Sequence, residues 1–155
     1  MSVKEELTRI SIELGDPAPF PKESVWARSL GRGYYEIRNY PFFAYDIHYL
    51  DKVRAKADPD GGSPTLTRVV SHSGHKTLRV LFSDTSPEPD DLVRLRSLKE
   101  RFGVKAEGWG NRFYALDVPP ESNYPAIIAQ LTAWENEEQL KFEFGCREDH
   151  EKYAG

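Results

Sequence analysis

The sequence has one cysteine, one methionine and no long apolar run among its 155 residues. A single cysteine, Cys146, excludes an intramolecular disulfide framework and a zinc site built from several cysteines. No stretch approaches the roughly 20 apolar residues of a membrane-spanning helix, and the first residues lack the apolar core of a signal peptide. We therefore expect a cytoplasmic protein that is held together by packing and does not contact a membrane.

Positive charge is not in excess either, because 21 Lys/Arg stand against 25 Asp/Glu and give a net charge of -4. Residues 1–75 carry ten of each sign, whereas residues 76–155 carry eleven Lys/Arg and fifteen Asp/Glu. The net charge thus belongs to the second half, and the overall balance disfavours a general nucleic-acid coat. With 39% hydrophobic residues, the chain is too apolar to be disordered.

The first half alternates apolar and polar residues in short runs that glycine and proline interrupt, which is typical of strands and turns. We predict strands near residues 10–14, 23–30, 34–40, 52–57 and 66–70. Five short strands with little helix signal favour a small, highly curved sheet or barrel.

The second half of the sequence combines helical patterns with strand patterns. Apolar residues recur at helical spacing over residues 92–102 and 127–134, and Gly103 and Ser122 are the expected C′ and N-cap residues. We predict strands at residues 78–82, 104–109, 112–118 and 140–144. The resulting βαββαβ order is that of the ferredoxin-like arrangement.

We therefore predict an α+β protein. A β-rich, barrel-like module, residues 1–75, packs on a ferredoxin-like module, residues 76–145, and an acidic tail follows at residues 146–155. Two helices cover one face of the second sheet, so the other face must meet solvent, a partner or the first module. A homodimer through that free face is one such arrangement.

Residues 71–75 place two histidines and two serines beside a glycine. Imidazole is the usual general base near neutral pH, and a nearby serine can act as a nucleophile. A small hydrolase or transferase would use His75 as its base, with Ser73 and His72 in support. Sequence neighbours seldom reach the geometry of a working Ser–His pair, so a turn is the simpler interpretation.

A metal site would have to draw on the few histidines of the chain. Two imidazoles and a carboxylate can hold zinc or iron, which would require His48, His72 and His75 to converge with Asp46 or Asp51. None of these residues stands in a recognised ligand motif, so we expect neither a metal nor another cofactor.

The most aromatic stretch, residues 39–46, follows the third predicted strand. Aromatic residues in a small sheet are mostly core, but they also dominate interfaces because they bury large areas at low entropic cost. Acidic residues near the C-terminus would suit a basic partner. The candidate binding residues are Trp26, Tyr35, Asn39, Phe42, Phe43, Tyr45, Asp46, Glu135, Glu137 and Glu138.

A basic cluster lies in the first predicted helix and just after it: Arg94, Arg96, Lys99, Arg101 and Lys105. A solvated helix face explains it, and phosphate contact is the alternative. RNA-binding proteins of this topology stack bases on aromatic residues of the two central strands. The strand at residues 112–118 matches that motif only weakly, so nucleic-acid binding is the second hypothesis.

Three separated segments resemble a bacterial family, domain of unknown function 4265. Residues 24–27 match its S-x-W-A, residues 39–44 its N-x-P-F-F-A, and residues 73–80 its S-G-H-S-T-I-R-V, with Lys76 replacing a small polar residue. The resemblance covers about residues 23–145 and carries no catalytic assignment. It singles out Trp26, Asn39, Pro41, Phe42, Phe43, Asp51, Gly74, His75 and Arg79, and we add Arg79 to the candidate binding residues.

Small acidic bacterial proteins of this kind often act as immunity proteins beside secreted toxins. This analogy rests on the class of protein and not on particular residues of this sequence. We therefore expect a non-enzymatic binding protein, most concretely an immunity-type protein that neutralises a basic, toxin-like protein by direct contact. The alternatives are a nucleic-acid-associated protein and a small hydrolase or transferase that uses His75.

Overall fold

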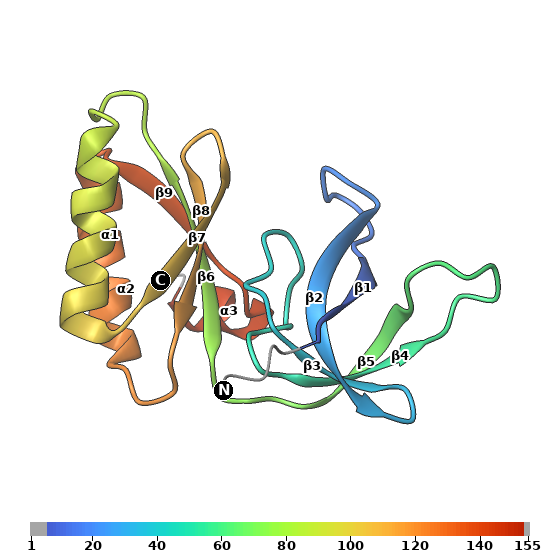
Figure 1. The fold of residues 1–155 in the computed structure, drawn as a ribbon. Coiled ribbons are helices and arrows are strands. Elements are labelled where there is room, and N and C mark those ends of the chain that lie inside the picture. The colour runs from blue at the N-terminus through green and yellow to red at the C-terminus, as the bar shows by residue number, and fades with distance from the viewer. Residues whose placement is uncertain (1–5, 154–155) are drawn as a thin grey trace.

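A computed structural model describes residues 6–153, and its strands form two sheets (Figure 1). Five strands close into a barrel: β1 (Thr8–Glu13), β2 (Lys22–Gly31), β3 (Tyr34–Ile37), β4 (Lys52–Lys56) and β5 (Thr65–Ser71). Successive strands pair antiparallel, and one parallel contact between Ser11 and Thr65 closes the barrel. The alternation of each strand directs Ile10, Val25 and Val53 into the barrel core.

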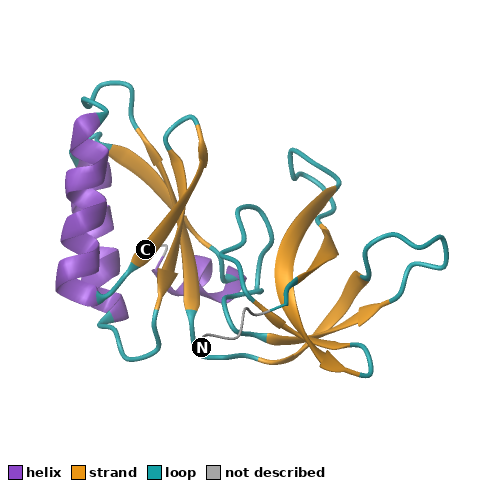
Figure 2. Ribbon diagram, viewed as in Figure 1, coloured by secondary structure: helices purple, strands orange, loops and turns teal. Residues whose placement is uncertain are grey.

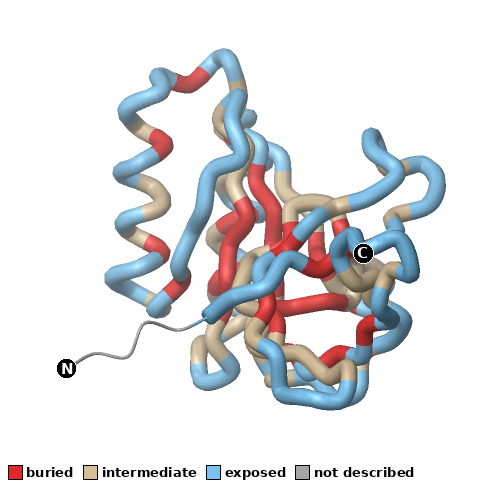
Figure 3. The backbone as a smooth tube through the Cα atoms, turned by 45° about the vertical axis from the view of Figure 1, so that its right-hand side comes forward, coloured by how far each residue is buried: buried red, intermediate tan, exposed pale blue. Residues whose placement is uncertain are grey.

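The second sheet has the strand order β7-β8-β6-β9, and its strands pair antiparallel. Along the chain its elements are β6 (Lys76–Phe82), α1 (Pro89–Phe102), β7 (Lys105–Gly110), β8 (Phe113–Val118), α2 (Tyr124–Asn136) and β9 (Leu140–Phe144). Both long helices lie on the face turned away from the barrel (Figure 1). Leu78, Leu116 and Leu131 belong to the core between this face and the helices, and the buried segments in Figure 3 follow the inner strands.

The predicted α+β class, with a barrel-like first sheet and helices on a second sheet, is confirmed (Figure 2). Gly103 ends α1 in the left-handed conformation with φ 76°, as predicted. The predicted N-cap of α2 is wrong by one residue, because Asn123 accepts the amide of Ala126. The hydroxyl of Ser122 instead donates to the carbonyl of Phe102. Serine and asparagine cap helices about equally well, so the sequence did not distinguish these neighbours.

The stretch that sequence patterns assign to an acidic tail contains a helix, α3 (Arg147–Tyr153). Its Asp149 is buried and accepts hydrogen bonds from the hydroxyl of Tyr124 (2.9 Å) and the ammonium of Lys76 (3.3 Å). Tyr153 stacks on Phe144 of β9, with 5.5 Å between the ring centroids. The C-terminal stretch is therefore packed on the sheet through buried polar and aromatic contacts.

Residues 38–51, here named the interlayer loop, cross between the barrel and the free face of the second sheet (Figure 1). Ala44 and Ile47 pack into the barrel core, while Thr77 and Arg79 contact the loop from the sheet. The free face is thus covered in part by the chain itself. None of the helices within residues 6–153 is both long and apolar enough to cross a membrane.

Candidate functional site

One carboxylate of the barrel anchors the start of the interlayer loop. Glu23, on β2, accepts hydrogen bonds from three successive amides, those of Phe42 (2.6 Å), Phe43 (3.1 Å) and Ala44 (2.9 Å). Hydrogen bonds to an ionised acceptor are about twice as strong as neutral ones. The backbone that carries the two phenylalanines is therefore fixed to the barrel.

Arg79 holds the same loop from the sheet. Its buried side chain donates from Nε to Glu143 (2.8 Å) and from Nη1 to the carbonyls of Ala44 (2.8 Å) and Pro41 (3.3 Å). The Tyr45 ring lies 4.8 Å from the guanidinium carbon, and its hydroxyl donates to Glu143 (2.7 Å). Burial and this hydrogen bond raise the pKa of Tyr45. A buried charge is costly unless it is paired and hydrogen-bonded, so these contacts define the position of the loop.

Asp46 and Asp51 fasten the rest of the loop. Asp46 accepts the amide of Arg147 (2.9 Å) at the start of α3. Asp51 is fully buried and accepts the amides of His48 (2.8 Å) and Ser73 (2.8 Å). Its second oxygen lies 2.9 Å from Nδ1 of His72, whose side chain is 58% exposed. One carboxylate thus joins the interlayer loop to the junction between the two sheets.

His48 is buried and neutral. Its Nδ1 accepts the amide of Thr77 (3.1 Å) and lies 2.9 Å from the hydroxyl of the same residue, so its proton belongs on Nε2. Burial lowers its pKa to about 4. The rings of His48 and His72 are 6.0 Å apart, but within residues 6–153 no group of three or more His, Cys, Asp or Glu side chains is arranged to hold a metal ion.

His75 pairs with a buried carboxylate of β8. Its Nδ1 lies 2.9 and 3.1 Å from the two oxygens of Asp117, whose pKa is raised mainly by burial. The Ser73 hydroxyl donates to the carbonyl of Tyr49 (2.6 Å) and accepts the backbone amide of His75 (3.1 Å). Ser73 therefore stabilises the turn through backbone groups, and the polar partner of the imidazole is Asp117.

Five rings from three segments form what we name the aromatic patch: Phe20, Phe42, Phe43, Trp109 and Phe113. The ring centroid of Phe43 lies 5.5 Å from that of Phe20, 5.3 Å from that of Trp109 and 5.9 Å from that of Phe113. The ring centroids of Phe42 and Phe113 are 6.1 Å apart. Phe20 is 43% and Trp109 49% exposed. The rings are thus packed on one another while the patch remains open to solvent.

Only part of this patch was predictable from the sequence. Phe42 and Phe43 were candidates, whereas Phe20, Trp109 and Phe113 come from a proline-rich loop and from the β7–β8 hairpin. Two other candidates belong to different surroundings: Trp26 lies under Arg9, at 4.9 Å, with its amide bonded to Asn39, and Tyr35 packs against the barrel core. Aromatic residues beside Pro19 and Gly110 were a usable signal, because such turns leave large side chains exposed.

Two clefts adjoin the free face of the second sheet. The interlayer cleft has a volume of about 630 Å³ and is lined by Phe43, Tyr45 and Phe113 together with charged side chains. Its charged residues are Glu13, Asp16, Glu143 and Arg147.

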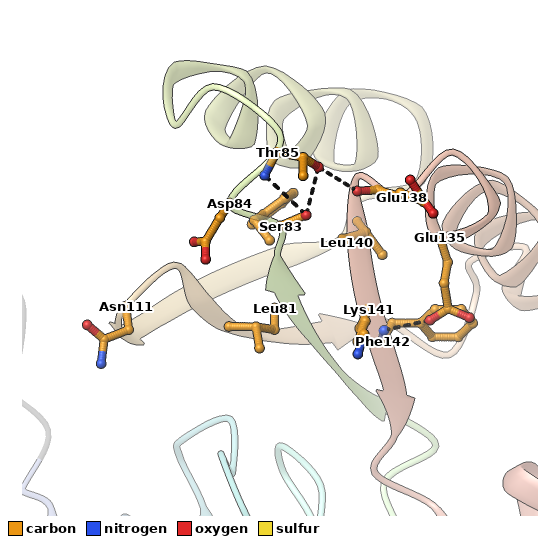
Figure 4. A pocket seen from close by; sticks show the side chains of 11 residues that line it. Leu81, Ser83, Asp84, Thr85, Asn111, Glu135, Glu138, Leu140, Lys141 and Phe142 are labelled. Atoms are coloured by element: carbon orange, nitrogen blue, oxygen red, sulfur yellow. Dashed lines mark hydrogen bonds between the residues drawn. The ribbon is translucent and has the colours of Figure 1, made fainter.

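The second cleft, here named the sheet-end cleft, has a volume of about 910 Å³ and lies where β6 ends and β9 begins (Figure 4). Its charged residues are Asp84, Glu135, Glu138 and Lys141. Glu135 also accepts the amide of Phe142 (3.1 Å). The third glutamate of the predicted acidic group, Glu137, caps the C-terminal end of α2. Each cleft therefore carries three carboxylates and one cation.

The five basic residues of the predicted cluster do not form one face. Arg94 donates to Ser86 and Gln139, and Arg101 donates to Gln130 of α2, so both tie α1 to neighbouring elements. The other three line a groove between α1 and β7: Arg96, Lys99 and Lys105.

Comparison with known proteins agrees with this description. The model of the family described as Domain of unknown function (DUF4265) matches residues 23–142. A structure titled "Novel crystal structure of a hypothetical protein from Neisseria gonorrhoeae" superposes with a TM-score of 0.76 at 16% identity, covering 93% of this chain and 97% of that one. At this identity the likeness shows the fold alone. No curated protein matches the chain.

Proposed function

The chain belongs to the DUF4265 family, and on that footing we propose that it is a non-enzymatic binding protein, most concretely an immunity-type protein. It would neutralise a basic, toxin-like protein by direct contact. The observation that carries this proposal is the aromatic patch, which offers exposed rings on a fixed backbone.

Rigid aromatic side chains are the residues that most often dominate the energy of protein interfaces. Phe43 is held at its amide by Glu23, and its ring contacts three other rings of the patch. Little conformational freedom remains for it to lose on binding, and such preorganisation favours affinity. Exposed apolar side chains that lie next to one another are a common feature of interaction sites on soluble proteins.

The charges around the patch support a basic partner. In the interlayer cleft, which Phe43 and Phe113 of the patch also line, three carboxylates lie beside one cation, although Glu143 is already paired with Arg79. Acidic borders steer a basic protein toward the patch and weaken with salt. We propose a bacterial and cytoplasmic setting for this contact, supported by the family resemblance and the single cysteine, and a ferredoxin-like assignment for the second sheet, supported by its connectivity.

The test uses the product of the adjacent gene as the partner and measures both binding by calorimetry and protection of cells. We expect Trp109→Ala combined with Phe20→Ala to weaken binding by about 30-fold or more, as truncation of interface anchors does, and to abolish protection. Val70→Ala, at a surface position of the barrel that is 38% exposed, should leave both unchanged. Unchanged protection by the patch variant, or binding that does not weaken with salt, would overturn the proposal.

A second candidate function rests on the contact between His75 and Asp117. A carboxylate on Nδ1 orients an imidazole for proton transfer at Nε2, as a hydrolase or transferase requires. His75→Gln should then abolish turnover of ester or phosphoester substrates while the unfolding midpoint stays close to that of the wild type. A large loss of stability in His75→Gln would instead assign the pair to the fold.

A further inference from the structure

The two edge strands of the second sheet, β9 and β7, differ in whether their outward-facing backbone is already occupied by hydrogen bonds. On β9, the carboxylate of Glu135 accepts the amide of Phe142 and so occupies part of the edge. β7 is the strand at the other edge, its six residues are exposed, and β8 is its only strand neighbour within residues 6–153. An open edge of this kind is a template for pairing with another strand.

A groove of about 770 Å³ runs beside this edge, between β7 and α1. It is lined by Leu92, which is 59% exposed, and by charged residues of both signs. The charged residues are Arg96, Lys99, Lys105, Glu100 and Glu107. Mixed charge disfavours a uniformly acidic or basic ligand, and it suits a surface that must complement itself.

We infer that β7 is the interface of a homodimer, in which the β7 strands of two copies pair antiparallel about a two-fold axis through Ala106 and join their sheets. In such a pair, directly opposed residues share a face of the sheet. Lys105 and Glu107 both lie on the free face, because they pair with Asp117 and Ala115 of β8.

The charges select the register of this pairing. An axis through Lys105 or Glu107 would set that residue opposite its own copy, and like charges in opposed positions are destabilising. An axis through Ala106 instead sets each Lys105 opposite the partner copy's Glu107 and forms two ion pairs of opposite charge. The pairing ends naturally at the β-bulge between Gly108 and Gly110. On the other face of the joined sheet, the two α1 helices would cover the exposed Leu92 side chains.

Charge reversal tests this register directly. Sedimentation velocity from about 1 µM to about 1 mM should show a dimer, and Glu107→Lys should raise its dissociation constant by about tenfold or more, since both ion pairs become repulsive. Lys105→Glu should act in the same direction, although Lys105 also influences the pKa of Asp117. The double variant Lys105→Glu/Glu107→Lys restores two opposite pairs and should return to within about threefold of the wild-type constant.

Mixing the two single variants should yield a heterodimer, because each supplies the charge that the other lacks. Lys56→Glu, on β4 of the barrel, is the matched control and should leave the dissociation constant unchanged. Hydrogen exchange of the wild type should show β7 amides that become protected as concentration rises. A monomer at every concentration, a dimer indifferent to the single reversals, or a double variant that stays monomeric would overturn the inference.

Discussion

Replacing Arg79 with methionine tests whether buried ionic contacts hold the interlayer loop in place. Methionine keeps most of the apolar stem but removes the donors to Glu143, Pro41 and Ala44. A hydrogen bond to a charged group contributes roughly 1.5–3 kcal/mol, but the Glu143 side chain is 38% exposed, so water can solvate part of its released charge. We expect the free energy of unfolding to fall by about 3 kcal/mol.

Urea and thermal denaturation measure this loss. One kcal/mol corresponds to a shift of about 2–4 °C in Tm for a chain of this size, so Arg79→Met should lower Tm by about 6–12 °C. Arg79→Lys keeps the charge without the planar fork and should lose about half as much. Glu143→Gln keeps an acceptor at a partly exposed site and should lose about 1 kcal/mol. The reasoning is refuted if the free energy of unfolding of Arg79→Met stays within about 1 kcal/mol of the wild-type value, or if Arg79→Lys loses as much stability as Arg79→Met.

Two further predictions concern the same loop. The pKa of His48 is lowered from 6.5 to about 4 by burial, so the unfolded chain binds a proton that the folded chain does not, and stability should fall as pH drops through this window. Urea titrations at several pH values should show this dependence flattened in His48→Asn, whose Oδ1 can still accept the Thr77 amide. Glu23→Gln keeps an acceptor but removes the charge from the three-amide contact, so the free energy of unfolding should fall by about 1 kcal/mol. Tryptophan fluorescence of the aromatic patch should change as well, and an unaltered spectrum would contradict a role for Glu23 in positioning it.

The elements of this fold were predictable because their signals are local. The alternation of β6, with Leu78, Val80 and Phe82 on one side, predicts both the strand and the face that meets the helices. Helix α3 was missed because its seven residues are mostly charged and show no apolar stripe. It forms on the sheet because Asp149 and Tyr153 find partners there, and those partners are distant in sequence.

The site was harder to predict for the same reason. Arg79 lies on a strand face that the pattern leaves open to solvent, yet its carbonyl acceptors come from a loop 35 and 38 residues earlier. Asp51 reaches Ser73 across 22 residues. Only the resemblance to a family singled out Arg79, and apart from that resemblance Asp51 was considered only as a metal ligand, because periodicity indicates which face a side chain occupies and not what will cover it.

The contacts of the interlayer loop also bear on how the aromatic patch comes to exist. Phe43 is positioned by Glu23 of the barrel, whereas Trp109 and Phe113 belong to the second sheet. The rings of the two sheets meet only when the sheets are packed together, and separating them would deprive the buried guanidinium of Arg79 of its carbonyl acceptors, Pro41 and Ala44. A protein that binds this patch therefore recognises the packed arrangement of both sheets, and its binding energy adds to the stability of that arrangement.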